Sequence, residues 1–258
     1  MGCKEYMVKF PDREDDLDQN EEWVRVEANG KCEKIRIHDY SRFYSIPDLY
    51  EEVVYRRLKC VSPHMVCRML RQEIRKENYG SLRVLDFGAG NGMVGECLRK
   101  DLSCEYLVGV DIIEEAKMAA SRDREGVYDD YWVLDFCNLD DKERKKIAAG
   151  KFNALITVAA LGFGDIPTQA FVNALNVMEN GSWVAFNIKE TFLAGEDKSG
   201  YKKLIETLTG KSICVLNNRH YRHRFSISGE PLYYWAIVGK KEKEVSWENM
   251  AEKNCGTA

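Results

Sequence analysis

The sequence predicts an α/β fold: a seven-stranded, mostly parallel sheet with an antiparallel last strand, preceded by an N-terminal β-hairpin and a helical lid. Three observations carry this prediction. From residue 82 onward, short runs typical of buried strands alternate with amphipathic helical patterns, as in a parallel sheet with helices on both faces. Residues 23–80 show a different pattern, strand-like and then helical. The turn Ser228-Gly229-Glu230-Pro231 suits a hairpin rather than a crossover helix.

Composition limits the class of protein. The 258 residues suffice for about one large domain, or for a domain with a small appendage, and 45% hydrophobic with 31% charged residues are globular values. The net charge of -4 is dispersed, so we expect neither nucleic acid nor a membrane as a partner. Nine irregularly spaced cysteines without a C-x-x-C pair predict no disulfide framework and no metal site. These features, and the lack of a long apolar run, predict a cytoplasmic protein.

The N-terminal third divides into two predicted parts. Residues 1–22 are expected to be a mobile acidic segment, because 12–22 hold seven acidic side chains and one arginine. Residues 23–80 are expected to form the hairpin and lid: 23–27 and 33–37 alternate with period two around Asn29-Gly30, a dipeptide suited to a tight turn. Apolar spacing over 49–58 predicts one helix, and Ser62 as N-cap before Pro63 begins another.

The main domain is predicted over residues 81–240, followed by a C-terminal tail at 241–258. Its strands are expected at 82–87, 106–110, 131–134, 154–158, 183–187, 213–216 and 233–238. Between them, Phe171, Ala174, Leu175 and Met178 recur at helical spacing and predict a helix that packs on the sheet.

Chemically informative residues follow three of these strands, at the edge where parallel sheets bind ligands. The first strand runs into Asp86-Phe87-Gly88-Ala89-Gly90-Asn91-Gly92, where glycines allow sharp turns and close approach of the backbone to a ligand. The second strand ends at Asp111, whose carboxylate suits the two hydroxyls of a ribose. The third ends at Asp135-Phe136, an acid and an aromatic ring suited to an adenine base.

The spacing within the turn bears on which nucleotide would bind. A dinucleotide-binding turn has a third glycine at the position that Met93 occupies here. Asp86, before the first glycine, suits the α-amino group of a methionine moiety and is a poor neighbour for a pyrophosphate. The turn therefore favours S-adenosylmethionine over NAD.

Over residues 82–239 this combination resembles the class I S-adenosylmethionine-dependent methyltransferases, which have a Rossmann-like sheet. The resemblance implies that the glycine turn holds the methionine part of S-adenosylmethionine, that Asp111 holds the ribose, and that Asp135 reaches the adenine. The expected cofactor-binding residues are Asp86, Gly88, Ala89, Gly90, Asp111, Ile112, Asp135 and Phe136.

The fourth strand end runs Thr157-Val158-Ala159-Ala160-Leu161-Gly162-Phe163-Gly164-Asp165. It lacks the Asn/Asp-Pro-Pro-aromatic motif of base-modifying amino-methyltransferases and offers a small apolar floor instead. We therefore expect a small-molecule methyl acceptor, with O- and N-methylation both open.

A hydroxyl acceptor needs a general base, and His220 and His223 are the catalytic candidates, with Glu190 as another. Strand alternation would place His220, Arg222 and Arg224 on one side. There Arg222 would bind an acidic acceptor, or the three would form a solvated face.

Tyr44 is a candidate substrate-binding residue, because with Tyr40 and Phe43 it would close over the acceptor or pack the lid onto the domain. Two other functions remain open at this stage. One is a non-catalytic S-adenosylmethionine-binding protein. The other is an NAD-dependent oxidoreductase, which fits less well because its Tyr-x-x-x-Lys spacing occurs only at Tyr55 and Lys59, before the nucleotide turn.

Overall fold

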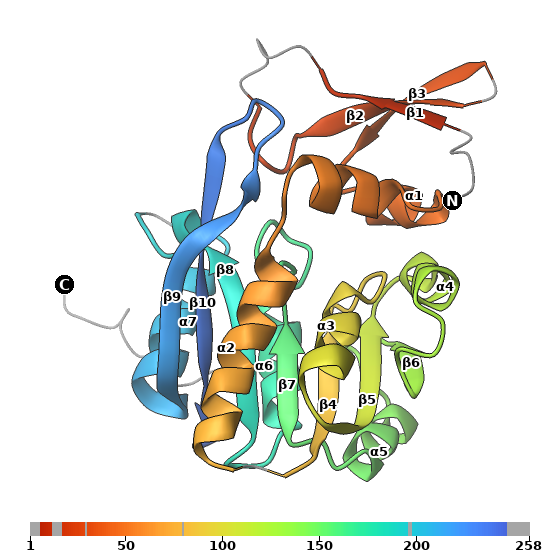
Figure 1. Cartoon of the computed structure of the whole chain (residues 1–258). Coiled ribbons are helices and arrows are strands. Elements are labelled where there is room, and N and C mark those ends of the chain that lie inside the picture. Colours follow the sequence, from red (N-terminus) through yellow and green to blue (C-terminus); the bar gives the residue numbers. More distant parts are fainter. Residues whose placement is uncertain (1–5, 12–16, 29, 79, 196–197, 247–258) are drawn as a thin grey trace.

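A computed structural model describes residues 6–11, 17–28, 30–78, 80–195 and 198–246 and confirms the predicted fold class. Seven strands form one sheet in the order β6-β5-β4-β7-β8-β10-β9 (Figure 1). Neighbours from β6 to β8 are parallel, and β10 runs antiparallel to both β8 and β9. The strands are β4 (Leu82–Phe87), β5 (Cys104–Asp111), β6 (Asp130–Val133), β7 (Ala154–Thr157), β8 (Trp183–Lys189), β9 (Ile213–Phe225) and β10 (Pro231–Lys241).

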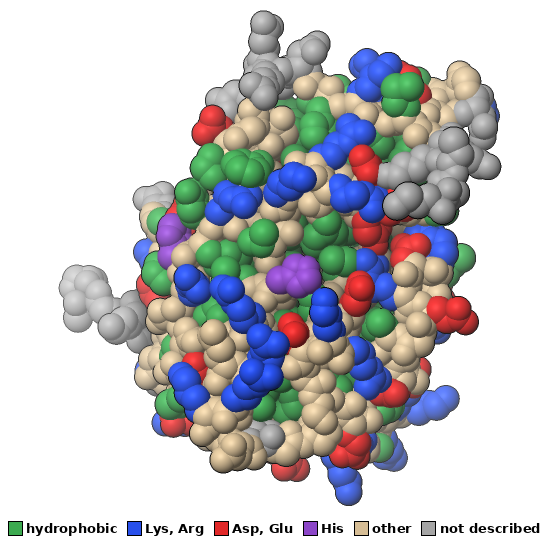
Figure 2. Space-filling model, in the orientation of Figure 1, with side chains coloured by type: hydrophobic (Ala, Val, Ile, Leu, Met, Phe, Trp, Pro, Cys, Tyr) green, Lys and Arg blue, Asp and Glu red, His purple; other side chains and the backbone are tan. Residues whose placement is uncertain are grey.

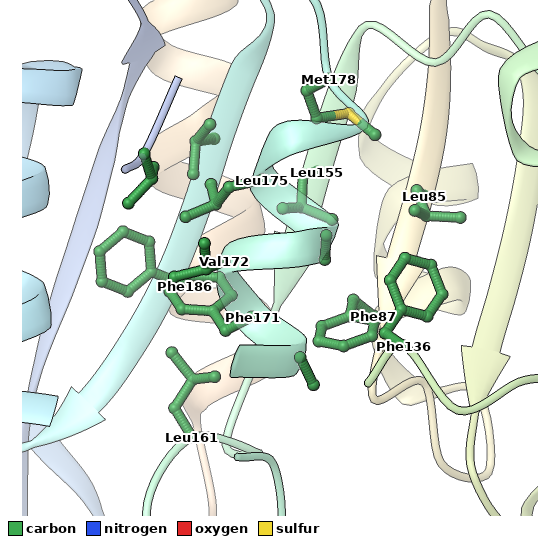
Figure 3. Packing of buried hydrophobic residues seen from close by; sticks show 14 of the residues in the cluster. Leu85, Phe87, Phe136, Leu155, Leu161, Phe171, Val172, Leu175, Met178 and Phe186 are labelled. Carbon is green, nitrogen blue, oxygen red and sulfur yellow. The ribbon is translucent and has the colours of Figure 1, made fainter. Parts of the chain in front are cut away.

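Helices cover both faces of this sheet. They are α2 (Ser62–Lys76), α3 (Met93–Asp101), α4 (Glu114–Asp123), α5 (Asp141–Ala149), α6 (Thr168–Asn176) and α7 (Tyr201–Thr207), with short turns η2 (Glu190–Phe192) and η3 (Leu208–Ser212). Helices α2 and α3 pack on one face, and α5, α6 and α7 on the other. The predicted apolar stripe of α6 faces the sheet, where the Phe171 ring meets Phe186 edge-on at a centroid distance of 5.5 Å (Figure 3).

The N-terminal part forms a separate small unit with its own hydrophobic core. Its elements are β1 (Tyr6–Lys9), β2 (Trp23–Ala28), β3 (Lys31–Arg36), α1 (Tyr40–Ser45) and a π-helix, η1 (Glu51–Arg57), and they are together called the lid below. The predicted hairpin is confirmed as β2 and β3, although Asn29 of its turn lies outside the described residues. Strand β1, which lies in the segment predicted to be mobile, pairs with β2 because Val8 joins the lid core.

The end of that acidic segment is also fixed in the structure. Glu22 is fully buried in an ion pair with Arg224, and its Oε1 accepts a hydrogen bond of 2.8 Å from the Ile227 amide. Gln19 donates to the Tyr234 hydroxyl at 2.9 Å. The acidic composition predicts a mobile segment, but the charge of Glu22 is balanced by the buried Arg224, far along the chain. Residues 12–16 lie outside the described residues.

Helix α2 differs from its predicted role in two ways. It packs on the sheet of the main domain through Val66 and Leu70, so it is not part of the lid. The N-cap is Val61, and the prediction of Ser62 as N-cap is wrong. The Ser62 hydroxyl is buried and lies 2.6 Å from both His223 Nδ1 and the Tyr221 hydroxyl. This side chain therefore joins α2 to β9 instead of capping the helix.

The surface is mixed in charge. Figure 2 shows Lys and Arg side chains spread over the face on which α2 lies, with acidic side chains among them. Within the ranges that the structure describes, no helix is both long enough and apolar enough to span a bilayer. Most of the predicted C-terminal tail, from residue 247 on, lies outside these ranges.

Candidate active site

A cavity of about 800 Å³ lies between the lid and the carboxyl ends of β4, β5 and β7 and the residues that follow β6. This is the edge of the sheet at which the sequence placed its candidate residues. One side, called the turn wall, is formed by Phe87–Asn91, Asp111–Ile113, Leu134–Cys137 and Val158–Ala160. The opposite side, called the lid wall, includes Arg36, His38, Asp39, Tyr40, Ser41, Tyr44, Tyr50 and Tyr55.

The glycine turn is packed so closely that side chains would not fit. Gly88 and Gly90 both have positive φ, +74° and +53°. A Cβ on Gly88 would lie 2.8 Å from Ala160 Cβ, and one on Gly90 would overlap the Tyr44 hydroxyl. Both positions require glycine for backbone conformation and for space.

Asp111 ties the end of β5 to this turn. Its Oδ2 accepts a hydrogen bond of 2.9 Å from the Gly90 amide, and its Oδ1 accepts one of 2.8 Å from the Ile112 amide. Burial raises the pKa of Asp111, and these backbone donors oppose the rise. Next to it, Ile112 is 59% exposed and borders the cavity.

Asp135 and Phe136 both border the cavity, but their side chains differ in setting. The Asp135 carboxylate accepts hydrogen bonds from the Cys137 amide at 2.8 Å and the Asn138 side chain at 2.7 Å. The Phe136 ring is buried in the core, with its centroid 4.9 Å from that of Phe87 in an edge-on contact (Figure 3). The Phe136 ring therefore belongs mainly to the core beneath the cavity and is not exposed for stacking on an adenine.

Asp86 lies fully buried and does not line the cavity. Its Oδ2 accepts a hydrogen bond of 2.6 Å from the Tyr128 hydroxyl, while no described residue bonds to Oδ1. Burial raises the pKa of Asp86 to about 7, and the Tyr128 hydrogen bond opposes that rise. A carboxylate with an unpartnered buried oxygen is a binding opportunity for a cation.

The aromatic residues predicted from 40–44 divide between two environments. Tyr44 lines the cavity with its hydroxyl over Gly90, and Tyr40 stacks on it with ring centroids 6.0 Å apart. Phe43 is fully buried in the lid core. Tyr40 and Tyr44 therefore face the space above the turn, and Phe43 holds the lid together.

The two histidines proposed from the sequence do not line this cavity. His220 is exposed, with Nε2 2.7 Å from Glu190 Oε2 and its ring 5.1 Å from those of Tyr233 and Trp235. His223 is buried beside a small second cavity, and burial lowers its pKa well below the ordinary value.

The predicted alternation of His220, Arg222 and Arg224 is wrong beyond residue 222. Arg222 pairs with Tyr233 and Arg224 with Leu232, so His223 is the extra residue of a β-bulge. The Arg224 guanidinium is consequently buried with Glu22. Arg222 lies outside the main cavity, with its guanidinium 4.2 Å from the Phe225 ring centroid.

The structure adds two residues that sequence reasoning did not select. His38 of the lid and Asp165 of the loop after β7 both line the cavity, and Nδ1 lies 3.3 Å from Oδ2. Tyr40 donates to the same Oδ2 at 3.3 Å. An acid after the fourth strand was visible in the sequence, but its partner lies in a separate folding unit, so no local pattern joins the two.

A scan of protein-family models and a search of curated protein sequences find no match to this chain. Solved structures do match. The N-methyltransferase NodS from Bradyrhizobium japonicum, in complex with S-adenosylhomocysteine, aligns over 80% of this chain and 98% of its own, with a TM-score of 0.54 and 12% identity. Protein 1320 of Thermoplasma acidophilum aligns over 80% and 97%, with a TM-score of 0.50 and 14% identity. The chain therefore has the fold of the class I methyltransferases.

Proposed function

We propose that this protein is an enzyme that binds S-adenosylmethionine on the turn wall and transfers its methyl group to a small molecule held beneath the lid. The observation that carries the proposal is the glycine turn. Gly88 and Gly90 leave no space for a Cβ, and Asp111 at the next strand end is bonded to the amide of Gly90. Backbone brought this close to a carboxylate at the open edge of a parallel sheet is typical of a nucleoside site.

Further features of the same wall suit the parts of S-adenosylmethionine. Asp111 lines the cavity and would accept from the ribose hydroxyls, and the exposed Ile112 would cover one face of the adenine. Asp135 would accept from the adenine amino group. Asp86 does not line the cavity but directly precedes Phe87 of the turn wall, and its unpartnered Oδ1 is proposed as the partner of the α-ammonium group, whose charge would lower the raised pKa of this carboxyl.

When bound, S-adenosylmethionine would supply a methyl group that is already electrophilic. The work left to the protein is to orient the acceptor and exclude water. Tyr40, Tyr44 and Tyr50 form the lid side of the cavity and would do both. Positioning of this kind contributes about 7–11 kcal/mol in favourable intramolecular reactions.

The acceptor is proposed to be small because the lid encloses the cavity opposite the turn wall. The arginine that suggested an acidic acceptor, Arg222, does not line the cavity, whereas Arg36 does. A non-catalytic S-adenosylmethionine-binding protein is the second candidate, since the turn wall alone would bind the nucleoside without an acceptor.

Calorimetric titration with S-adenosylmethionine, S-adenosylhomocysteine and NAD tests the nucleoside first. We expect both adenosyl sulfur compounds to bind at micromolar concentration, about -8 kcal/mol, and NAD not to bind. Binding of NAD alone would overturn the proposal. Formation of S-adenosylhomocysteine in the presence of an acceptor then separates an enzyme from a binding protein.

Asp111→Ala sharpens this test. The substitution is expected to weaken binding of S-adenosylmethionine by about 1.5–3 kcal/mol, because hydrogen bonds to a charged acceptor are lost. Glu105→Ala is the matched control, since Glu105 lies on the same strand and pairs with Arg83 away from the cavity. Equal affinity in the folded Asp111 variant would refute the ribose role.

A further inference from the structure

A histidine from the lid and a carboxylate from the main domain meet inside the cavity. His38 Nδ1 lies 3.3 Å from Asp165 Oδ2, and the two side chains are only 10% and 22% exposed. The Tyr40 hydroxyl donates to the same oxygen at 3.3 Å. Because the two residues come from opposite walls, the pair exists only with the lid closed onto the main domain.

The surroundings of this pair fix its place relative to the turn wall. Asp165 precedes Ile166, whose Cδ1 would lie 3.1 Å from a Cβ on Gly88. The loop that carries Asp165 includes Phe163, which has a strained φ of 55° and packs edge-on against the His38 ring at 5.1 Å. The imidazole and the glycine turn therefore line the same cavity.

The carboxylate beside Nδ1 indicates which nitrogen is free. The position of Asp165 Oδ2, 3.3 Å from Nδ1, favours a proton on Nδ1 and a lone pair on Nε2, and no described residue bonds to Nε2 of His38. The other histidine–carboxylate pair has the reverse arrangement, because Nε2 of His220 is the atom that contacts Glu190, and it lies outside the cavity. Only His38 combines a carboxylate on Nδ1, a free Nε2 and a position in the cavity wall among the described residues.

We propose that His38 is the general base for a hydroxyl acceptor and that Asp165 is its positioning residue; this inference rests on the proposed function. The proton of the acceptor O–H passes to Nε2 while an oxygen lone pair forms the new O–CH₃ bond. The electron pair of the broken S–CH₃ bond stays on sulfur, which gives S-adenosylhomocysteine. The imidazolium, stabilised by Asp165, then releases its proton to water.

The lid wall suits an acceptor with an aromatic body. The stacked rings of Tyr40 and Tyr44 form a surface that leads from the glycine turn to the His38–Asp165 pair. A phenol or alcohol holds its proton at neutral pH and needs a base, whereas a neutral amine attacks without one. The charged and titratable groups that face this end of the cavity and the adjoining small cavity are Arg36, Asp39, Tyr40, Tyr50, Asp165, His223, Arg224 and Tyr234.

His38→Gln, with His220→Gln as the control, tests the base. Each variant is first titrated with S-adenosylhomocysteine, which tests the nucleoside site independently of the base. Transfer of the labelled methyl group of S-adenosylmethionine to a panel of phenols, alcohols and amines is then measured from about pH 6 to pH 9.

We expect His38→Gln to keep wild-type affinity for S-adenosylhomocysteine and to lose about 10²- to 10⁴-fold in transfer to a hydroxyl. His220→Gln is expected to retain transfer. Wild-type transfer by the His38 variant, or transfer only to amines, would overturn the proposal.

Nitrogen NMR of ¹⁵N-histidine protein bound to S-adenosylhomocysteine gives a readout that needs no acceptor. We expect the neutral imidazole of His38 to carry its proton on Nδ1, and we expect Asp165→Asn to disturb this tautomer while His220 stays unchanged. Under the proposal, Asp165→Asn lowers kcat more than it raises KM. A proton on Nε2 of His38, or the same tautomer in the Asp165 variant, would refute the arrangement even if no panel compound is methylated.

Discussion

The two walls of the cavity are built on different principles. The turn wall consists of backbone and short side chains at the ends of neighbouring strands, held by contacts such as the Asp111 bond to the Gly90 amide. The lid wall consists of aromatic side chains whose support is a separate small core. One wall is rigid because the sheet itself fixes it, and the other depends on how the lid is attached. Mutations in the turn wall would therefore mainly change nucleoside binding, and mutations in the lid wall would mainly change binding of the acceptor.

The attachment of the lid is strongly polar. Glu51 of the lid accepts from Arg124 at 2.7 Å and from Asn91 of the glycine turn at 2.6 Å. The Tyr44 carbonyl accepts from Arg122 at 3.0 Å. Behind the lid, Glu22 and Arg224 form the fully buried ion pair. Three experiments, one of them at this ion pair, test the contrast between the walls.

The largest effect is expected at the buried ion pair. Glu22→Ala leaves the Arg224 charge buried without a partner, which typically costs about 3–5 kcal/mol. Guanidinium unfolding should show this loss of stability. The double variant Glu22→Leu with Arg224→Met should recover most of it, because no charge is then left buried. A single variant as stable as wild type would mean that water reaches Arg224 and that this part of the lid is not anchored.

The Glu22–Arg224 pair is an example of a contact that the sequence does not predict. The strands of the main domain were predicted to within a few residues, except for β9, which extends to Phe225 instead of residue 216. The turn-wall residues were recognised because periodicity and glycine spacing are local properties. Glu22 with Arg224, and His38 with Asp165, are pairs between distant segments, and their partners depend on where the lid docks. The β-bulge at His223 likewise has no local signature, so alternation placed Arg224 on the wrong side.

A smaller effect, of opposite sign, is expected behind the turn wall, at Asp86. The pKa of Asp86 is about 7 in the folded protein against an ordinary value of 3.8. Between these values the folded state binds the proton more tightly than the unfolded state does. The stability that this carboxyl contributes is therefore present in full below about pH 4 and is lost as the pH rises through about 7.

Asp86→Asn removes this dependence. Without ligand, the stability of the variant relative to wild type should rise by on the order of 2–3 kcal/mol between pH 5 and pH 8, since the pKa of about 7 lies about two units above pH 5 and each unit corresponds to about 1.4 kcal/mol. Affinity for S-adenosylmethionine should fall in the same variant. Unfolding curves at the two pH values, with and without S-adenosylhomocysteine, measure both changes. A constant stability difference at both pH values would contradict the raised pKa.

The smallest effect is expected where the two walls touch, at Gly90. Gly90→Ala introduces a Cβ at positive φ, which costs about 1–2 kcal/mol, and the new methyl group also meets the Tyr44 hydroxyl. Gly126→Ala is the matched control, because Gly126 has φ of +74° with no atom near its missing Cβ. Adding Tyr44→Phe should restore part of the affinity for S-adenosylhomocysteine that Gly90→Ala loses. It should restore none of the stability that Gly126→Ala loses. Strict additivity of Gly90→Ala and Tyr44→Phe would show that the lid does not rest on the turn in solution, since residues in contact should couple by 0.5 kcal/mol or more.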